Sequence, residues 1–279
     1  MKRVWVPASA LLFLSLLSWC SPARIGTLVV APEPAAQPEP APPPVPEPDA
    51  MPIRHLAAWD GENLRQKPIM HQAVWRQRGI GLPLETDDPE ARAKRVVMLT
   101  FDDGPGVGTE SILDTLAKYH VPAMFFITRR AMQHPDLVER EYREGHTIAP
   151  HSMTHANLTK LTPEQIRQEL DPLIDLIRQV TGAPPKYLRP PFGAYNKEVQ
   201  AVAREYNLEI VNWTHGSLDW DGTDAKGYKD PNQVVEDATR GLYRGSVILF
   251  HDTLKQTAEA LPDVINRLRE AGFEFVVLQ

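Results

Sequence analysis

From residue 95 onward, strand-like and helix-like segments alternate along the chain, and this alternation constrains the fold more than any other feature. Short apolar, β-branched-rich runs predict seven strands, at 96–100, 123–128, 147–149, 187–189, 209–213, 246–250 and 273–278. Helical patterns between them predict six helices, at 109–119, 135–144, 162–180, 196–206, 231–243 and 256–271. Strands that alternate with helices favour parallel pairing through helical crossovers. Residues 95–279 are therefore predicted to form an α/β domain on a parallel sheet or barrel.

The first predicted strand runs directly into two adjacent carboxylates, Asp102 and Asp103, which Gly104 and Pro105 follow. A Gly-Pro turn ends a strand, so both acids lie at its carboxyl end. That end is where α/β folds bind ligands, and a pair of acids in a core is costly unless it is paired or metal-bound. Taken alone, the stretch reads equally well as a solvated acidic turn.

Polar clusters follow four other predicted strands in the same way. They are 151–155 (HSMTH), 189–193 (RPPFG), Asp219 with Trp220, and His251 with Asp252. The carboxyl ends of parallel strands meet at one face of a sheet or barrel, so these clusters are expected to lie close to the two acids. Five such clusters indicate one functional site.

His151 and His155 are spaced i, i+4, which would direct both imidazoles to the same side of a helical turn. Together with Asp103 they form a set of two histidines and one carboxylate, which binds a catalytic divalent metal and leaves positions open for water and substrate. The single cysteine, Cys20, excludes a Cys-rich zinc site and an intramolecular disulfide. One divalent ion is therefore predicted, zinc first, with cobalt, nickel and manganese as alternatives. The remaining histidines of the domain are interpreted as structural or surface residues: His120, His134, His146 and His215.

The order and content of these clusters resemble the five motifs of the polysaccharide deacetylase family, the NodB homology domain of carbohydrate esterase family 4. The matching segments are 100–105 (TFDDGP), 151–155, 189–193, 219–220 (DW) and 249–251 (LFH). The resemblance covers 95–279. It implies a distorted (β/α)7-type barrel with parallel strands, and an active site at the C-terminal ends of the strands.

The resemblance also implies a division of labour between the two acids. Asp103, His151 and His155 would be the metal ligands. Asp102 would be the general base that takes a proton from the attacking water, and Arg189 would hold Asp102 in place.

The remaining motifs would act on the leaving group and the acetyl group. By resemblance, His251 is the general acid and Asp219 orients it. The backbone N–H of Phe192 would stabilise the oxyanion, and Trp220 and Leu249 would wall a small pocket for the acetyl methyl.

Two positions depart from the family pattern. Phe192 stands where tyrosine is usual, which removes a hydroxyl but keeps the backbone N–H. Gly216 stands where the family often has the first Asp of an Asp-x-x-Asp-Trp motif, which puts the loop geometry in doubt rather than the role of Asp219.

The resemblance implies a metal-dependent hydrolase that removes N-acetyl groups from a hexosamine-containing polysaccharide. Peptidoglycan is the first expectation, with poly-N-acetylglucosamine or chitin-like oligomers as alternatives. A rival with the same fold is an O-acetyl esterase on a glycan such as xylan. A rival of another class is a non-catalytic glycan-binding module, although no base, ligand or acid is missing. The net charge of −6 gives no basic footprint for nucleic acid, and a monomer is the default state.

Residues 1–20 have the layout of a secretory signal peptide, with two basic residues before an apolar run at 4–19. The segment 17–20 resembles a bacterial lipoprotein box in which Cys20 would be lipidated, but Trp19 is bulky where a small residue is expected. Ordinary cleavage and an uncleaved anchor are the alternatives. All three predict export to the bacterial periplasm or cell surface, and lipidation or an uncleaved anchor would tether the protein to the membrane.

Two segments separate the predicted signal peptide from the α/β domain. Residues 21–50 are predicted to be an extended linker, because nine of the 17 residues at 32–48 are proline. Residues 51–94 carry scattered apolar residues without clean periodicity. They are predicted to be an irregular extension that packs on the main domain.

Overall fold

The computed structural model describes residues 73–222 and 228–279. The predicted signal peptide at 1–20 with Cys20, the predicted linker at 21–50 and residues 51–72 of the predicted extension lie outside the described residues. Within the described ranges, no helix combines the length and apolar character that crossing a membrane requires.

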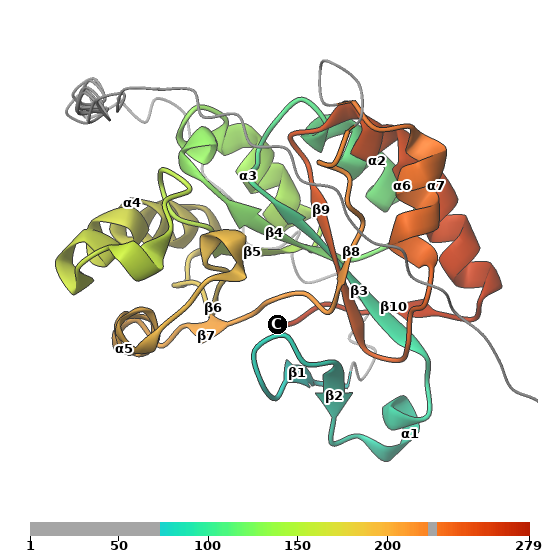
Figure 1. Ribbon diagram of the computed structural model, residues 1–279, viewed down its shortest axis with the longest axis horizontal. Coiled ribbons are helices and arrows are strands. Elements are labelled where there is room, and N and C mark those ends of the chain that lie inside the picture. The colour runs from blue at the N-terminus through green and yellow to red at the C-terminus, as the bar shows by residue number, and fades with distance from the viewer. Residues whose placement is uncertain (1–72, 223–227) are drawn as a thin grey trace, which may run out of the picture. The chain divides into compact units, whose positions relative to one another are not determined.

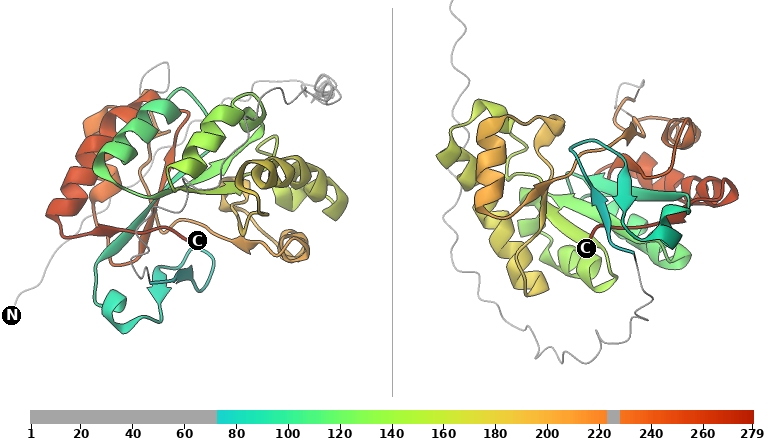
Figure 2. Two further views of the ribbon diagram at one scale, coloured as in Figure 1. Left: turned by 180° about the vertical axis from the view of Figure 1, so that it is seen from behind. Right: turned by 90° about the horizontal axis from the view of Figure 1, so that it is seen from below.

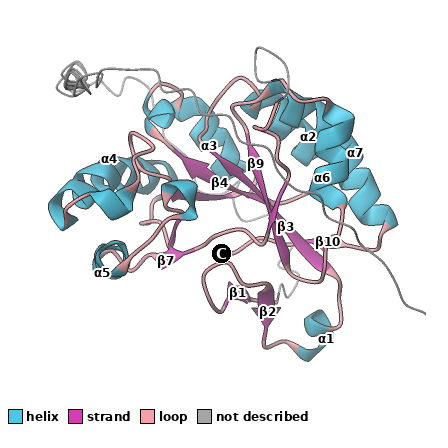
Figure 3. Cartoon of the chain, in the orientation of Figure 1, coloured by secondary structure: helices cyan, strands magenta, loops and turns pink. Residues whose placement is uncertain are grey.

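Helices and strands alternate along the described chain, as the sequence predicts (Figures 1 and 3). The strands are β1 (Trp75–Gln77), β2 (Leu84–Thr86), β3 (Val96–Asp102), β4 (Ala123–Ile127), β5 (Thr147–Pro150), β6 (Tyr187–Leu188), β7 (Glu209–Ile210), β8 (His215–Gly216), β9 (Ser246–His251) and β10 (Glu274–Phe275). The helices are α1 (Pro89–Arg92), α2 (Thr109–Tyr119), α3 (Pro135–Arg143), α4 (Pro163–Thr181), α5 (Lys197–Glu205), α6 (Pro231–Thr239) and α7 (Lys255–Glu270). Each predicted strand and helix has an observed counterpart, although β6, β7 and β10 are only two residues long.

The main sheet is parallel throughout, with strand order β5-β4-β3-β9-β8 and with β10 paired to the start of β3. Strands β6 and β7 form a separate parallel pair. That pair meets the main sheet where the Arg189 N–H donates to the Pro150 carbonyl at 3.3 Å. The predicted α/β class with parallel strands is therefore confirmed, and the separate β6–β7 pair is the main distortion.

Strand β3 is buried along its whole length and separates two cores. Val97, Leu99 and Phe101 pack in the cluster that includes residues of α2, α6 and α7. These three helices lie together on the same side of the sheet, seen from the front in Figure 1 and from behind in Figure 2 (left). The alternate residues Val96 and Met98 belong to the cluster inside the barrel. Because successive side chains of a strand point to opposite faces, Asp102 also faces the barrel interior.

The described part of the predicted extension, residues 73–94, is not irregular. It forms the antiparallel hairpin β1–β2 and the one-turn helix α1. The Leu84 N–H donates to the Gly245 carbonyl at 2.8 Å, just before β9 begins, and Leu84 packs with Trp75 and Leu278 in the interior core. The hairpin therefore lies against the amino ends of the barrel strands. Two three-residue strands carry too little alternation to be detected from sequence.

Candidate active site

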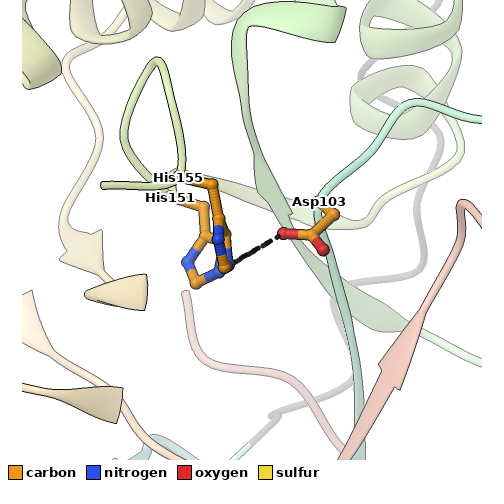
Figure 4. Close-up of side chains that lie close together, drawn as sticks. All are labelled: Asp103, His151 and His155. Atoms are coloured by element: carbon orange, nitrogen blue, oxygen red, sulfur yellow. Dashed lines mark ion pairs between the residues drawn. The ribbon is translucent and has the colours of Figure 1, made fainter. Parts of the chain in front are cut away.

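Asp103, His151 and His155 converge at the carboxyl ends of β3 and β5 (Figure 4). The Nε2 atoms of His151 and His155 lie 3.6 and 3.4 Å from Asp103 Oδ1. Asp103 Oδ1 is buried and accepts no hydrogen bond from any described residue. A buried carboxylate oxygen without a donor, facing two imidazole nitrogens, suits a divalent cation. Among the described residues, this is the one His/Cys/Asp/Glu group with metal-binding spacing.

The tautomer of His151 is fixed by the backbone. Its Nδ1 lies 2.6 Å from the Arg189 carbonyl oxygen, which can only accept, so Nδ1 carries the proton and Nε2 keeps its lone pair. Burial lowers the pKa of His151, against the opposing effects of Asp102, Asp103 and the Arg189 carbonyl. His151 is therefore held neutral, the form in which an imidazole binds a metal.

The structure corrects the reason why the two histidines meet. Residues 151–157 form no helix, so the predicted helical turn is wrong. Ser152 and His155 have φ angles of 69° and 56°, in the left-handed region, and the loop folds back so that the ring centroids lie 5.2 Å apart. Asp103 also has a positive φ, of 74°. Non-glycine residues in this region are strained by about 1 kcal/mol or more, and such residues cluster at functional sites.

The two adjacent acids have different surroundings. Asp102 Oδ1 accepts a hydrogen bond from Arg189 Nη1 at 2.7 Å, while Asp102 Oδ2 lies 3.6 Å from His151 Nε2. Arg189 is fully buried, and its guanidinium lies over the Phe126 ring at 3.9 Å. Its Nη1 also donates to Thr100 Oγ1 at 2.8 Å. One oxygen of Asp102 is thus paired with the buried Arg189 cation, and the other faces His151 of the candidate metal site.

His251 ends β9, directly beside Asp102 in the β3–β9 register. Its Nδ1 donates to Asp219 Oδ1 at 2.9 Å, and Asp219 Oδ2 accepts from the His251 N–H at 2.7 Å and from Thr257 Oγ1 at 2.6 Å. Burial opposes the charged form of His251. The hydrogen bond and charge of Asp219, together with Asp102 and Asp103, outweigh it and raise the pKa of His251 to about 9.

An exposed aromatic ring lies beside His155 of the candidate metal site, and another lies beside His251. Phe192, 64% exposed and with a φ of 62°, meets the His155 ring edge-on at a centroid distance of 4.7 Å. Trp220, 45% exposed, meets the His251 ring edge-on at 5.1 Å. Leu249 is buried in β9 beside Gly216, and a Cβ on Gly216 would lie 3.5 Å from the Trp220 ring. A longer side chain at 216 would therefore compete with Trp220 for space.

Several residues that hold the site were not predicted. Thr100 lies in the matching segment 100–105, but its hydrogen bond with Arg189 was not predicted. Thr257, whose hydroxyl donates to Asp219, lies in none of the motifs. Gln256 Nε2 donates to the Asp219 carbonyl at 3.0 Å.

Asp252 is a buried acid next to His251, but its carboxylate contacts the segment that follows β3, at Gly104 and Thr109. Its Oδ2 accepts from Thr109 Oγ1 at 2.5 Å, and burial raises its pKa to about 7 against that hydrogen bond. A Cβ on Gly104 would lie 2.0 Å from Asp252 Oδ2, so the site requires glycine there.

The comparisons with known proteins agree with this geometry. The family profile described as "Polysaccharide deacetylase" matches residues 90–211. A protein of Bacillus cereus named peptidoglycan-N-acetylglucosamine deacetylase is 36% identical over 66% of this chain and 69% of its own length. This chain belongs to the polysaccharide deacetylase family.

Other members of the family cover different shares of the chain. The peptidoglycan-N-acetylglucosamine deacetylase PgdA of Listeria monocytogenes is 35% identical over 68% of this chain, which spans only 39% of that relative. The solved family 4 carbohydrate esterase from Streptomyces lividans, in complex with acetate, has a TM-score of 0.60 at 32% identity and covers 66% of this chain and 93% of its own. The likeness to this solved carbohydrate esterase confirms the predicted (β/α)7-type barrel.

Proposed function

We propose that this protein is a metal-dependent deacetylase that removes N-acetyl groups from a hexosamine-containing polysaccharide. The observation that supports the proposal most strongly is that Asp102 and His251 lie side by side at the carboxyl ends of β3 and β9. Asp102 is held by buried Arg189, and beside it in the sheet His251 is held by buried Asp219. A base and an acid with separate supports are what hydrolysis of an amide needs. The names of the Bacillus and Listeria relatives favour peptidoglycan as the polymer.

The ligands Asp103, His151 and His155 would hold one divalent ion, and their mixed nitrogen and oxygen donors suit zinc, with cobalt, nickel or manganese as alternatives. When bound, that ion would polarise the acetyl carbonyl and the attacking water as a Lewis acid. Asp102, through Oδ2, takes the proton that the water gives up as it attacks. Arg189 keeps Asp102 in the orientation that points Oδ2 towards the ligands.

His251 donates a proton to the sugar nitrogen as the C–N bond breaks, so that acetate and a free amine leave. Asp219 orients the ring through Nδ1, which leaves Nε2 as the donating atom. The Phe192 N–H is assigned to the developing oxyanion. Trp220 and Leu249 are assigned to the wall around the acetyl methyl, beside the acid.

The roles proposed for the N-terminal segments at 1–20 and 21–50 rest on the sequence alone. Residues 1–20 would direct export, with Cys20 as the candidate lipidation site, and 21–50 would tether the domain at 95–279 near the envelope. An enzyme on such a tether would meet a cell-wall polymer at the bacterial surface or in the periplasm. The expected partner is the polysaccharide itself, with a monomer as the default state.

Acetate release tests the proposed bond and substrate class. The full-length protein, supplied with zinc, is expected to release acetate from N-acetylglucosamine oligomers and from isolated peptidoglycan. Acetylated xylan is the matched ester substrate. Release from xylan with none from the N-acetyl substrates would favour the O-acetyl esterase, and release from none of them would favour a glycan-binding module.

The pH profile tests the assignment of His251. The protonated form is the acid, so activity is expected to fall as pH rises through the pKa of His251. That pKa is about 9, and it would lie lower with a bound cation nearby. Asp219→Asn removes the charge that raises this pKa, so the basic limb should move to lower pH and kcat should fall about 100-fold or more. A basic limb that stays in place in Asp219→Asn would contradict the role of His251.

A further inference from the structure

The loop 217–221 directly follows β8 and carries both Asp219 and Trp220. Leu218 has a φ of 53°, so the backbone turns through the left-handed region at that residue. The turn leaves Leu218 and Trp220 exposed on either side of the fully buried Asp219. A non-glycine residue persists in this conformation only when its surroundings hold it there.

Asp219 has anchors of its own. Its carboxylate accepts hydrogen bonds from His251 and from Thr257, and its carbonyl accepts one from Gln256. These donors belong to β9 and α7. These bonds end on Asp219 itself. The turn before it is held by other contacts: the Ser217 N–H donates to the Leu249 carbonyl at 3.1 Å, and the Asp219 N–H donates to Ser217 Oγ at 3.3 Å.

The Leu218 carbonyl accepts two hydrogen bonds. The Asp221 N–H donates to it at 3.0 Å, which closes the turn around Trp220, and the donor from outside the loop is Lys229. Lys229 Nζ donates to the Leu218 carbonyl at 2.9 Å and to Asp237 Oδ2, on α6, at 2.7 Å. The Lys229 side chain is only 5% exposed. Removing an ammonium from water costs free energy that only close partners repay, so this cation is confined between the loop and the helix.

Helix α6 is itself fixed to the sheet. His215 Nε2, on β8, donates to the Asp237 carbonyl at 2.6 Å. A carbonyl can only accept, so this ring nitrogen carries the proton. The chain of contacts therefore runs from β8 through α6 to Lys229 and ends at the turn before Trp220.

We propose that Lys229 is a positioning residue that holds the Trp220 wall in place and thereby sets the affinity for the acetylated sugar, an inference that rests on the proposed deacetylase function. Because Asp219 is anchored separately, Lys229 acts on substrate binding and leaves proton transfer by His251 unchanged. The effect should therefore appear in KM and not in the basic limb of the pH profile.

Steady-state kinetics of Lys229→Met in the full-length, metal-loaded protein test this division. A hydrogen bond from a charged donor is lost, so KM for N-acetylglucosamine oligomers should rise about tenfold, while kcat stays within about threefold. Lys229→Arg keeps a cationic donor and should restore part of the KM. The matched control is Arg240→Met, which removes the exposed partner of Asp237 and leaves the loop untouched. Its KM should equal that of the wild type.

A second readout needs no activity. The fluorescence of Trp220, isolated by subtracting a Trp220→Phe background, reports how freely acrylamide reaches the ring. Quenching should increase in Lys229→Met and stay unchanged in Arg240→Met. Thermal unfolding of each variant shows whether it is folded.

The outcomes separate this inference from the proposed function. Unchanged quenching together with an unchanged KM in folded Lys229→Met would overturn the role of Lys229. A shifted basic limb in that variant would also overturn it, because Lys229 would then act through Asp219. If the wild type releases no acetate and Trp220 quenching still responds to Lys229→Met, the deacetylase proposal fails while the positioning of the loop by Lys229 stands.

Discussion

Asp102→Asn is expected to reduce deacetylation by about 1,000-fold or more while the protein still binds its metal. The amide oxygen of asparagine can accept the Arg189 hydrogen bond, but the side chain cannot take a proton from water. The three predicted ligands are untouched, so metal content should stay near that of the wild type. Acetate release measured beside metal analysis of the same sample checks both halves of the result.

Arg189 makes a stability control necessary for this variant. Neutralising Asp102 leaves a fully buried guanidinium without its carboxylate, and removing one partner of a buried ion pair costs about 3–5 kcal/mol. Thermal unfolding should therefore show a lower midpoint with a folded baseline at the assay temperature. Asp252→Asn is the matched control, because it changes another buried acid near the site that the mechanism does not use. Metal loss in Asp102→Asn would contradict the separation of base from ligands.

His151→Ala should lose both metal and activity. The change removes one of the two nitrogen ligands in the predicted set of three, together with the donor to the Arg189 carbonyl, so metal affinity should fall by more than about 100-fold. Activity without added metal should then be at background. Metal titration followed by acetate release measures the two losses together.

The surface histidine His134 provides the control for this second prediction. It is exposed before α3 and makes no capping hydrogen bond, so His134→Ala should match the wild type in metal content and rate. Chelation of the wild type should remove activity, and added zinc should restore it. Full activity after exhaustive chelation would contradict the metal-dependent account.

The order of elements and the position of the two acids could be predicted from the sequence because they depend on local patterns. A buried apolar run followed by Asp-Asp-Gly-Pro already indicates a strand end, although β3 runs to Asp102, two residues beyond the predicted end at Thr100. The role of Asp103 as a ligand depends on atoms brought in by β5. That convergence follows from the parallel topology, which the alternation of helices and strands predicted.

What the sequence could not supply is backbone conformation and long-range support. The loop that brings His151 and His155 together uses left-handed residues at Ser152 and His155, which resist prediction because neither is glycine. Lys229 lies nine residues after Trp220 and belongs to none of the predicted motifs, yet its ammonium reaches the Leu218 carbonyl. A hydrogen bond such as the one between Lys229 and Leu218 forms only in the packed fold. It corresponds to no hydrophobic periodicity or motif in the sequence.

Mass spectrometry of peptidoglycan fragments tests the central claim most directly. Isolated envelope glycan is treated with the zinc-loaded full-length protein, and with Asp102→Asn at the same concentration. The account predicts fragments that have lost acetyl groups from the sugar nitrogens, with an equal amount of free acetate, in the wild-type sample alone. Glycan that keeps every N-acetyl group after treatment with the folded, metal-loaded wild type would contradict it.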